Sequence, residues 1–336
     1  MLPLPARCGF SEVLYHAATL SSLDTREVAR ELLASRDPRL RALYRRRPWR
    51  SAWGLLRCWG TIALALCLVT WQTTPITIAV AFVMIGTQQY ALSILSHEAK
   101  HRNLFVSAKL NDRVGLWLTA APLGASFRAE RRRHLAHHDR LGHEDDPDRD
   151  LYRARDKARG REVLLYLSTL TTLPGLRQPG AAAASPETPG PRIPDLLRER
   201  WQAIPLQAFV FGVFLALLHW WLYPLLWIAP LVVLMLVPAR IRQFCEHAQP
   251  LLPDALADHR RLVTYRPGPV ERLFLAPFHI GYHAEHHLWP GVPCWNLPAL
   301  ARLVPDDRRV ERRGSYTAFL VAYCRRLPLM AVPGPG

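Results

Sequence analysis

Two long uncharged stretches interrupt a chain that is otherwise rich in charge. Neither 58–96 nor 201–239 contains an Asp, Glu, Lys or Arg, and each stretch holds 39 residues. A helix needs about 20 residues to cross the apolar core of a bilayer, so each stretch has room for two crossings and a tight turn. Turn-forming residues lie near both midpoints, at Gln72-Thr73-Thr74-Pro75 and at Tyr223-Pro224. The pattern therefore predicts two helical hairpins.

The four predicted membrane spans cover residues 55–72, 76–96, 203–222 and 225–241. Aromatic residues flank the turns of both hairpins, where their amphipathic rings favour the membrane interface; they are Trp71, Trp220, Trp221 and Tyr223. The alternative is a buried helical core in a soluble protein. Two uncharged runs of this length disfavour that alternative, so the fold class expected is an all-α integral membrane protein.

The segments outside the spans predict shorter elements. Residues 1–54 form an N-terminal arm, in which "DTREVARELLASRDP" is typical of a helix with Asp24 or Thr25 as N-cap and a second cap at Asp37. The apolar segment 114–127 is too short to cross and predicts an interfacial or re-entrant element. Segment 161–176 is expected on the membrane surface, and the Pro-, Gly- and Ala-rich segment 177–194 reads as a linker. The main domain is predicted over 55–302 and a C-terminal tail over 303–336.

The charge distribution predicts the topology. The chain has a formal net charge of +16, and every Lys and Arg lies outside the two uncharged stretches. Both termini and the central segment therefore share one side, which the positive-inside rule makes cytoplasmic. No nucleic-acid module is visible, so a membrane-facing surface explains the charge better than nucleic-acid binding does. The six Cys show no paired spacing that would indicate a disulfide framework. Arg greatly outnumbers Lys, and we expect a bacterial inner membrane.

Most of the 14 histidines are clustered at spacings of three and four residues. The clusters are "HEAKH" (His97, His101), "HLAHH" (His134, His137, His138) and "HAEHH" (His283, His286, His287), and His247 stands alone after the fourth span. On a helix these offsets share a face, so each cluster is expected to offer all its imidazoles to one point. An even number of spans separates the clusters, which places all nine side chains on the cytoplasmic side. Nine imidazoles suit two metal ions, and ligand type alone leaves Fe, Zn, Cu and Ni open.

The first cluster also matches the H-E-x-x-H motif of zinc proteases, in which Glu98 would be the general base. That hypothesis leaves six clustered histidines without a role, and the later span contains no carboxylate for a third zinc ligand. Glu98 is better interpreted as an acceptor that orients a ligand imidazole, and Asp146, Glu246 and Glu285 are candidates for the same role. A non-catalytic metal-binding or transport protein is a further alternative. The lack of His, Asp or Glu along most of the spans argues against a transport path.

The order and spacing of the clusters resemble the three histidine boxes of the membrane fatty-acid desaturase and hydroxylase superfamily. "RRRHLAHHDRLGHEDDPD" and "HAEHHLWPGVPCWNLPAL" are similar to short bacterial desaturase-like members, and the resemblance runs from about residue 60 to 302. It implies four spans with a cytoplasmic helical cap carrying a di-iron site. His247 matches an additional ligand position of the family, and Gln243 an amide that holds a metal-bound water. The first box has three intervening residues, whereas acyl-CoA desaturases carry four. His279 has no assigned role.

The resemblance implies O₂-dependent removal of hydrogen from a fatty-acyl or lipid chain, with two iron ions as cofactor. A hydroxylase or ketolase acting on an acyl chain, a carotenoid or another apolar metabolite is the close alternative. The chain shows no dinucleotide fingerprint and no ferredoxin-type Cys spacing. Electrons are therefore expected from an external donor, a ferredoxin-like carrier or a cytochrome with its reductase.

Overall fold

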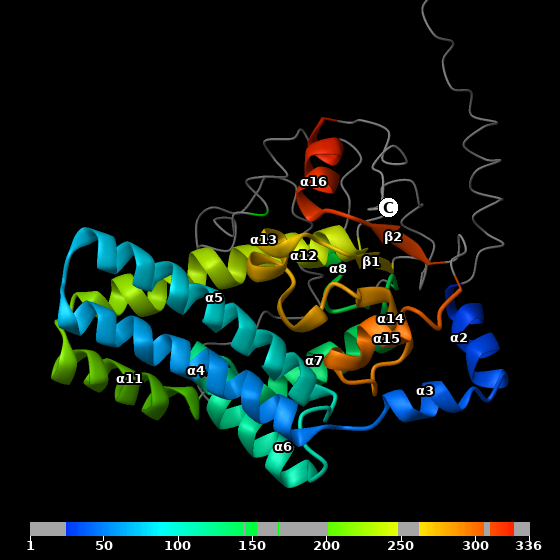
Figure 1. Cartoon of the computed structure of the whole chain (residues 1–336), viewed down its shortest axis with the longest axis horizontal. Coiled ribbons are helices and arrows are strands. Elements are labelled where there is room, and N and C mark those ends of the chain that lie inside the picture. The colour runs from blue at the N-terminus through cyan, green and yellow to red at the C-terminus, as the bar shows by residue number, and fades with distance from the viewer. Residues whose placement is uncertain are drawn as a thin grey trace, which may run out of the picture.

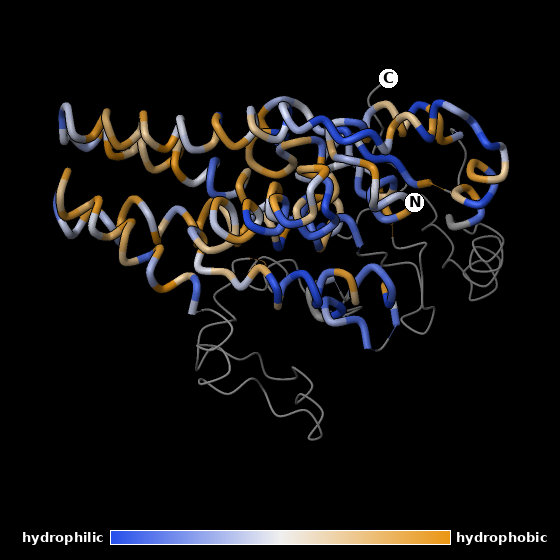
Figure 2. Tube along the Cα trace, turned by 90° about the horizontal axis from the view of Figure 1, so that it is seen from below, coloured by the Kyte–Doolittle hydropathy of each residue, from blue (hydrophilic) through white to orange (hydrophobic). Residues whose placement is uncertain are grey.

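The computed structural model describes residues 25–143, 145–152, 167, 201–247, 262–305 and 310–325. The predicted linker 177–194 lies outside these ranges, as does segment 161–176 apart from Leu167. Long apolar helices form one half of the molecule, and short helices and loops form the other (Figure 1). Figure 2 shows hydrophobic residues dominating the long helices and hydrophilic ones gathered at the opposite end.

The first predicted hairpin consists of α4 (Pro48–Trp71) and α5 (Pro75–Lys100), which pack against each other. Both are long and apolar enough to cross a membrane. The expected turn ends where the Thr74 side chain accepts a hydrogen bond from the Thr77 backbone and Thr77 caps Thr74 in return. Pro75 occupies the first helical position, where its missing N–H costs nothing. Both helices are longer than the predicted spans 55–72 and 76–96 at the end near the histidines: α4 begins at Pro48 and α5 ends at Lys100. Polar residues continue both helices there.

The second hairpin departs from the prediction in one arm. Its return arm is a continuous helical run, Pro224–His247, which is long and apolar enough to cross. This run is π-helical in η4 (Pro224–Ile228) and η5 (Leu231–Leu236) and ends as α12 (Val237–His247). The outgoing arm, α11 (Ala203–Leu217), has only 15 residues rather than the 20 predicted for 203–222. Three helices of the described chain therefore meet the length of a span, and α11 is a shorter apolar helix.

The segment after α5 folds back on it and fixes the helix end that carries the first histidines. It contains α6 (Ala108–Val114), a π-helical turn η1 (Gly115–Ala120) and η2 (Ala121–Leu123). η1 packs against α5, and buried Asn111 donates to the Ala99 carbonyl at 2.8 Å. This is the short non-spanning element that the sequence predicts over 114–127.

The half of the molecule that carries the histidines, called the cap half below, consists of short elements, most of which contribute to a second apolar cluster. They are α2 (Thr25–Ala34), α3 (Pro38–Leu43), α7 (Phe127–Arg140), α8 (Arg149–Tyr152), α13 (Pro269–Phe274), η6 (Pro277–His279), α14 (His283–Leu288), η7 (Cys294–Asn296), α15 (Leu297–Leu300) and α16 (Tyr316–Cys324). Asp37 caps α3 as predicted, accepting from the Arg39 backbone N–H at 2.8 Å.

The all-α prediction is wrong in one detail. Two short strands, β1 (Val263–Tyr265) and β2 (Glu311–Arg313), pair in parallel. Each has three residues, too few to give an alternating pattern in the sequence. Tyr265 N also donates to the Gly281 carbonyl at 2.7 Å, so this sheet anchors the loop that leads into α14.

Candidate metal centre

Four elements bring the nine predicted histidines to one place at the cap end of the spans. His97 lies in the last turn of α5, and His101 is its C-cap. α7 carries the second cluster, α14 the third, and His247 is the last residue of α12. Five of the nine side chains are buried and the other four half-buried. Segments up to 190 residues apart in sequence thus meet at one point.

The first group of converging imidazoles contains five residues whose ligand atoms all lie within 4.8 Å of one another. Nε2 of His134 lies 2.7 Å from Nε2 of His101 and 3.1 Å from that of His138. His286 Nε2 is 3.2 Å from His138 Nε2. His97 completes the group, with its ring centroid 4.3 Å from that of His134.

The second group is built on His137, His247 and His287, which meet the same 4.8 Å criterion. His247 Nε2 lies 3.1 Å from His137 Nε2 and 2.9 Å from His283 Nε2. The His283 ring is also 4.4 Å from that of His287, so His283 is a fourth member. The two groups touch where the rings of His138 and His287 stack with centroids 3.9 Å apart.

The structure corrects the expectation that each cluster serves one point. His134 and His138 face the first group and His137 the second, whereas His283 and His287 face the second group and His286 the first. The reason is helical geometry: residues i and i+4 differ by about 40° around the axis, but i+3 lies about 60° to the other side of i. The pair with spacing four therefore converges, and the middle histidine points elsewhere.

The imidazoles fit two metal ions. Each of the five close nitrogen contacts joins two Nε2 atoms. Nitrogens bound at about 2.1 Å and at right angles to each other on one ion lie about 3 Å apart, which is the spacing observed. Among the described residues the buried Nε2 of His287 has no hydrogen-bond partner, as expected of an atom placed to bind a metal.

Burial keeps these imidazoles in the neutral form that binds metal. Burial is the main cause that lowers the pKa of His101 to about 3. For the same reason the pKa values of further members lie well below the ordinary value, and their mutual repulsion as cations adds to the effect; these are His134, His138, His283, His286 and His287.

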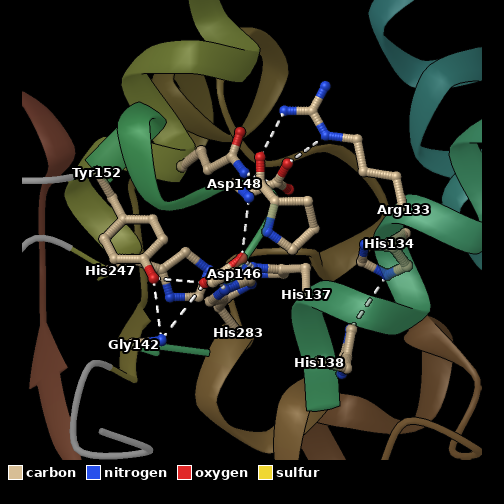
Figure 3. Close-up of polar contacts among 12 residues, drawn as sticks. Arg133, His134, His137, His138, Gly142, Asp146, Asp148, Tyr152, His247 and His283 are labelled. Carbon is tan, nitrogen blue, oxygen red and sulfur yellow. Dashed lines mark hydrogen bonds and ion pairs between the residues drawn. The ribbon is translucent and has the colours of Figure 1, made fainter. Parts of the chain in front are cut away.

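Two of the predicted carboxylates contact ligand imidazoles at the second group. His137 Nδ1 donates to Asp146 Oδ1 at 2.9 Å (Figure 3), and His283 Nδ1 lies 3.2 Å from Glu246 Oε2. Burial raises the pKa of Asp146, but the charge of His137 and the hydrogen bonds from His137, Tyr152 and the Asp148 backbone together outweigh it, and the net pKa is lowered. A carboxylate on Nδ1 leaves the Nε2 lone pair free for a metal.

The other three predicted supporting residues contact no imidazole as a hydrogen-bond partner. Glu98 Oε1 is 3.7 Å from His97 Nδ1, and its Oε2 accepts the Cys294 backbone N–H at 2.9 Å. Glu285 accepts from Thr264 Oγ1, and burial raises its pKa. Gln243 donates to Asp148 Oδ2 at 2.8 Å. Gln243 also lines the cavity described next, where the predicted contact with a metal-bound water stays a prediction.

A cavity of about 200 Å³ lies against the imidazoles and runs toward the spans. Its walls include His97, His134, His137, His247, His283 and His287 at one end. The other walls are mixed: Ile94, Met235 and Ala239 are among the apolar residues, and Lys100, Glu130, Asp148 and Arg242 are among the charged ones. Residues of the long apolar helices thus border the same cavity as the imidazoles.

Three residues that hold the site are not among the candidates expected from the sequence. Tyr152 donates to Asp146 (Figure 3), Tyr316 donates to Glu246 at 2.8 Å, and Arg242 donates to Glu246 at 2.6 Å. The Glu246 partner Arg242 is four residues away on the same helix and was within reach of sequence reasoning; the tyrosines were not. His279 joins neither group and has a positive φ of 62°.

Comparisons with known proteins agree with this geometry. The sequence model of the fatty acid desaturase family matches residues 70–317. The chain is 28% identical over 256 residues to the beta-carotene ketolase of Paracoccus sp. (strain N81106 / MBIC 01143), covering 73% of this chain and 88% of that protein. It is 28% identical over 260 residues to the dihydrorhizobitoxine desaturase of Bradyrhizobium elkanii, with 73% and 71% covered. Identity is 23% over 254 residues to the sn-1 acyl-lipid omega-3 desaturase (ferredoxin) of Nostoc sp. (strain 36), with 70% and 68% covered.

Proposed function

The chain belongs to the fatty acid desaturase family, and from that premise we propose that it is an O₂-dependent di-iron oxidoreductase that introduces a double bond into a fatty-acyl or lipid chain. The observation that carries the proposal is the convergence of nine imidazoles in two groups beside a cavity that runs to the spans. Imidazole is a suitable ligand for iron. A zinc protease, in contrast, needs three protein ligands and leaves the second group unexplained.

The residues of this chain have three tasks in such a reaction. Two irons would supply O₂ activation and the abstraction of hydrogen from an unactivated C–H bond. The nine histidines would hold both metals through neutral nitrogens, and Asp146 and Glu246 would keep His137 and His283 in the binding tautomer. The cavity walls would exclude water and place one part of an apolar substrate beside the metals.

A ketolase or hydroxylase is the second candidate, because two of the relatives found are named beta-carotene ketolases. The same histidines serve either outcome, and the position of the substrate carbon in the cavity decides between them. The cavity lining, which mixes apolar and charged residues, does not choose between an acyl chain and a carotenoid, so the product has to be measured.

The remaining expectations complete the proposal. The positive-inside rule supports a cytoplasmic site and cytoplasmic termini in a bacterial inner membrane. A relative whose name includes ferredoxin supports an external electron donor of that kind, and a cytochrome with its reductase is the alternative donor.

The proposal is tested by metal and product analysis of the full chain expressed in a bacterial host. Purified protein should contain about two irons per chain, and His286→Ala should lose metal because His286 Nε2 faces the first group. His219→Ala is the matched control, since His219 is exposed and lies in neither imidazole group. New double bonds in the host lipids support a desaturase, and added oxygen supports a ketolase or hydroxylase. One zinc per chain, unaffected by His286→Ala, would overturn the di-iron proposal.

A further inference from the structure

The two imidazole groups differ in what their outward nitrogens contact. In the second group, His137 Nδ1 bonds Asp146 at 2.9 Å, and His283 Nδ1 lies 3.2 Å from Glu246 Oε2, an ion-pair distance at which the hydrogen-bond geometry is not met. In the first group, His286 Nδ1 is buried without a hydrogen-bond partner among the described residues. His97 Nδ1 is 3.7 Å from Glu98, beyond hydrogen-bond distance. Within the described part of the chain, close carboxylate support is therefore confined to the second group.

Each of the two supporting carboxylates is held by a buried tyrosine. Tyr152 OH donates to Asp146 Oδ2 and accepts the Gly142 backbone N–H at 3.0 Å (Figure 3). Tyr316 OH donates to Glu246 Oε1 at 2.8 Å. Both tyrosines are at most 1% exposed, so water does not replace them.

The tyrosine hydroxyls restrict how the carboxylates can turn. A carboxylate that accepts from Tyr on one oxygen presents the other to the imidazole: Glu246 bonds Tyr316 through Oε1 and faces His283 with Oε2. Asp146 likewise bonds Tyr152 through Oδ2, and its Oδ1 is the closer of its two oxygens to His137 Nδ1. Partners of this kind fix the tautomer and the ring orientation of metal-ligating histidines.

We infer that Tyr152 and Tyr316 are positioning residues for the metal ion of the second imidazole group alone, acting through Asp146–His137 and Glu246–His283. The inference rests on the proposed function in so far as it takes both groups to bind metal. Removing either hydroxyl takes one hydrogen bond from a carboxylate, which keeps its other partners but is held less firmly, and so loosens one ligand of the second position. The first position keeps all five of its imidazoles and loses nothing.

The test measures Co²⁺ binding to the metal-stripped full chain through its visible absorbance. His101→Ala removes one imidazole of the first group and should weaken the first position, and His247→Ala should weaken the second, so that the two binding steps separate in each background. Tyr152→Phe should weaken Co²⁺ binding about tenfold in the His101→Ala chain and leave it unchanged in the His247→Ala chain. Asp146→Asn should have an equal or larger effect in the same background. Without either background substitution, Tyr152→Phe should shift one of the two binding steps.

Tyr316→Phe provides a second, independent variant. It keeps the ring that stacks on Tyr265 at 4.0 Å and the Arg242–Glu246 ion pair, so the fold is retained. Tyr223→Phe is the matched control, because Tyr223 OH donates to Gln207 at 2.8 Å, away from the imidazoles. Equal weakening of both positions, or of neither, by Tyr152→Phe and Tyr316→Phe would overturn the inference. Failure of the unaltered chain to bind two metal ions would instead overturn the proposed function.

Discussion

Gly86 lies on α5 where this helix packs closely against Leu234 of η5, and its replacement by Ala is a direct test of that packing. A Cβ on Gly86 would lie 2.6 Å from Leu234 Cδ1, 2.7 Å from Leu234 Cβ and 3.0 Å from Pro230 Cβ. Carbon atoms prefer about 3.5–4.0 Å. The Leu234 methyl can rotate away, but the two Cβ atoms are fixed to the backbone of the other helix. Gly86→Ala therefore forces α5 and η5 apart by some tenths of an ångström or more.

The size of the expected loss of stability follows from comparison with Gly60→Ala. No atom lies within 4 Å of a Cβ on Gly60, which is an exposed residue within α4. Both substitutions gain about 0.5–1 kcal/mol from the removal of a helical glycine. That gain cancels in the difference, which leaves the overpacking term of about 1–3 kcal/mol against Gly86→Ala.

Displacement of α5 and of the helix that contains Leu234 should also displace imidazoles, because both helices carry predicted metal ligands. α5 continues from Gly86 to His97 over about 16 Å, and the helix of Leu234 ends at His247. Thermal unfolding in detergent should place the Gly86→Ala midpoint several degrees below that of Gly60→Ala, and iron content should fall in parallel. Equal midpoints for the two variants would refute the close approach of α5 and η5.

Three further predictions follow from buried polar groups. The metal-free chain should lose stability as the pH falls below about 6.5, because burial lowers the pKa of imidazoles such as His101 (to about 3) and the unfolded chain then binds more protons. Its unfolding midpoint should rise from acidic to neutral pH and then level off; a flat profile would contradict this. Glu98→Ala should cost about 1–3 kcal/mol by leaving the buried Cys294 N–H without its acceptor, and Glu98→Gln, which keeps an oxygen, should cost less. A protease would instead lose peptide cleavage with its stability intact. Gln89→Leu removes the 2.8 Å hydrogen bond to the Trp227 carbonyl between two spans, and denaturation in detergent should show a loss of about 1 kcal/mol; no loss would show that this bond does not hold the spans together.

The length of the two uncharged stretches was enough to predict three of the long apolar helices, because a bilayer excludes charge and imposes a minimum span. It failed for the outgoing arm 203–222, where the helix ends at Leu217 although apolar residues continue. Hydropathy reports where a chain avoids water, not where its backbone stops being helical. The three-residue strands β1 and β2 were missed for a related reason: their pairing is set by a partner about 48 residues away.

The convergence of the histidines was predictable, but their division into two imidazole groups was only partly so. Helix geometry alone makes the histidine at i+3 face a different direction from those at i and i+4, so this division could be predicted from the spacing. The second and third histidine clusters, however, serve the two imidazole groups in opposite ways, and spacing does not explain that difference. On α7 the spacing-four pair serves the first group, whereas on α14 it serves the second. Identical spacing in "HLAHH" and "HAEHH" gives the two helices the same set of directions, so only their orientation relative to each other can reverse the roles.

That orientation is set by residues far from the boxes. Cys294 N bonds Glu98, which ties the segment after α14 to the end of α5, and Tyr265 N bonds Gly281, which fixes the segment before α14. Breaking either tie should therefore disturb both metal positions, because α14 supplies His286 to one and His287 to the other. Loss of the Tyr152 hydroxyl should disturb only the second. The two kinds of substitution thus separate residues that orient a helix from residues that orient a single imidazole.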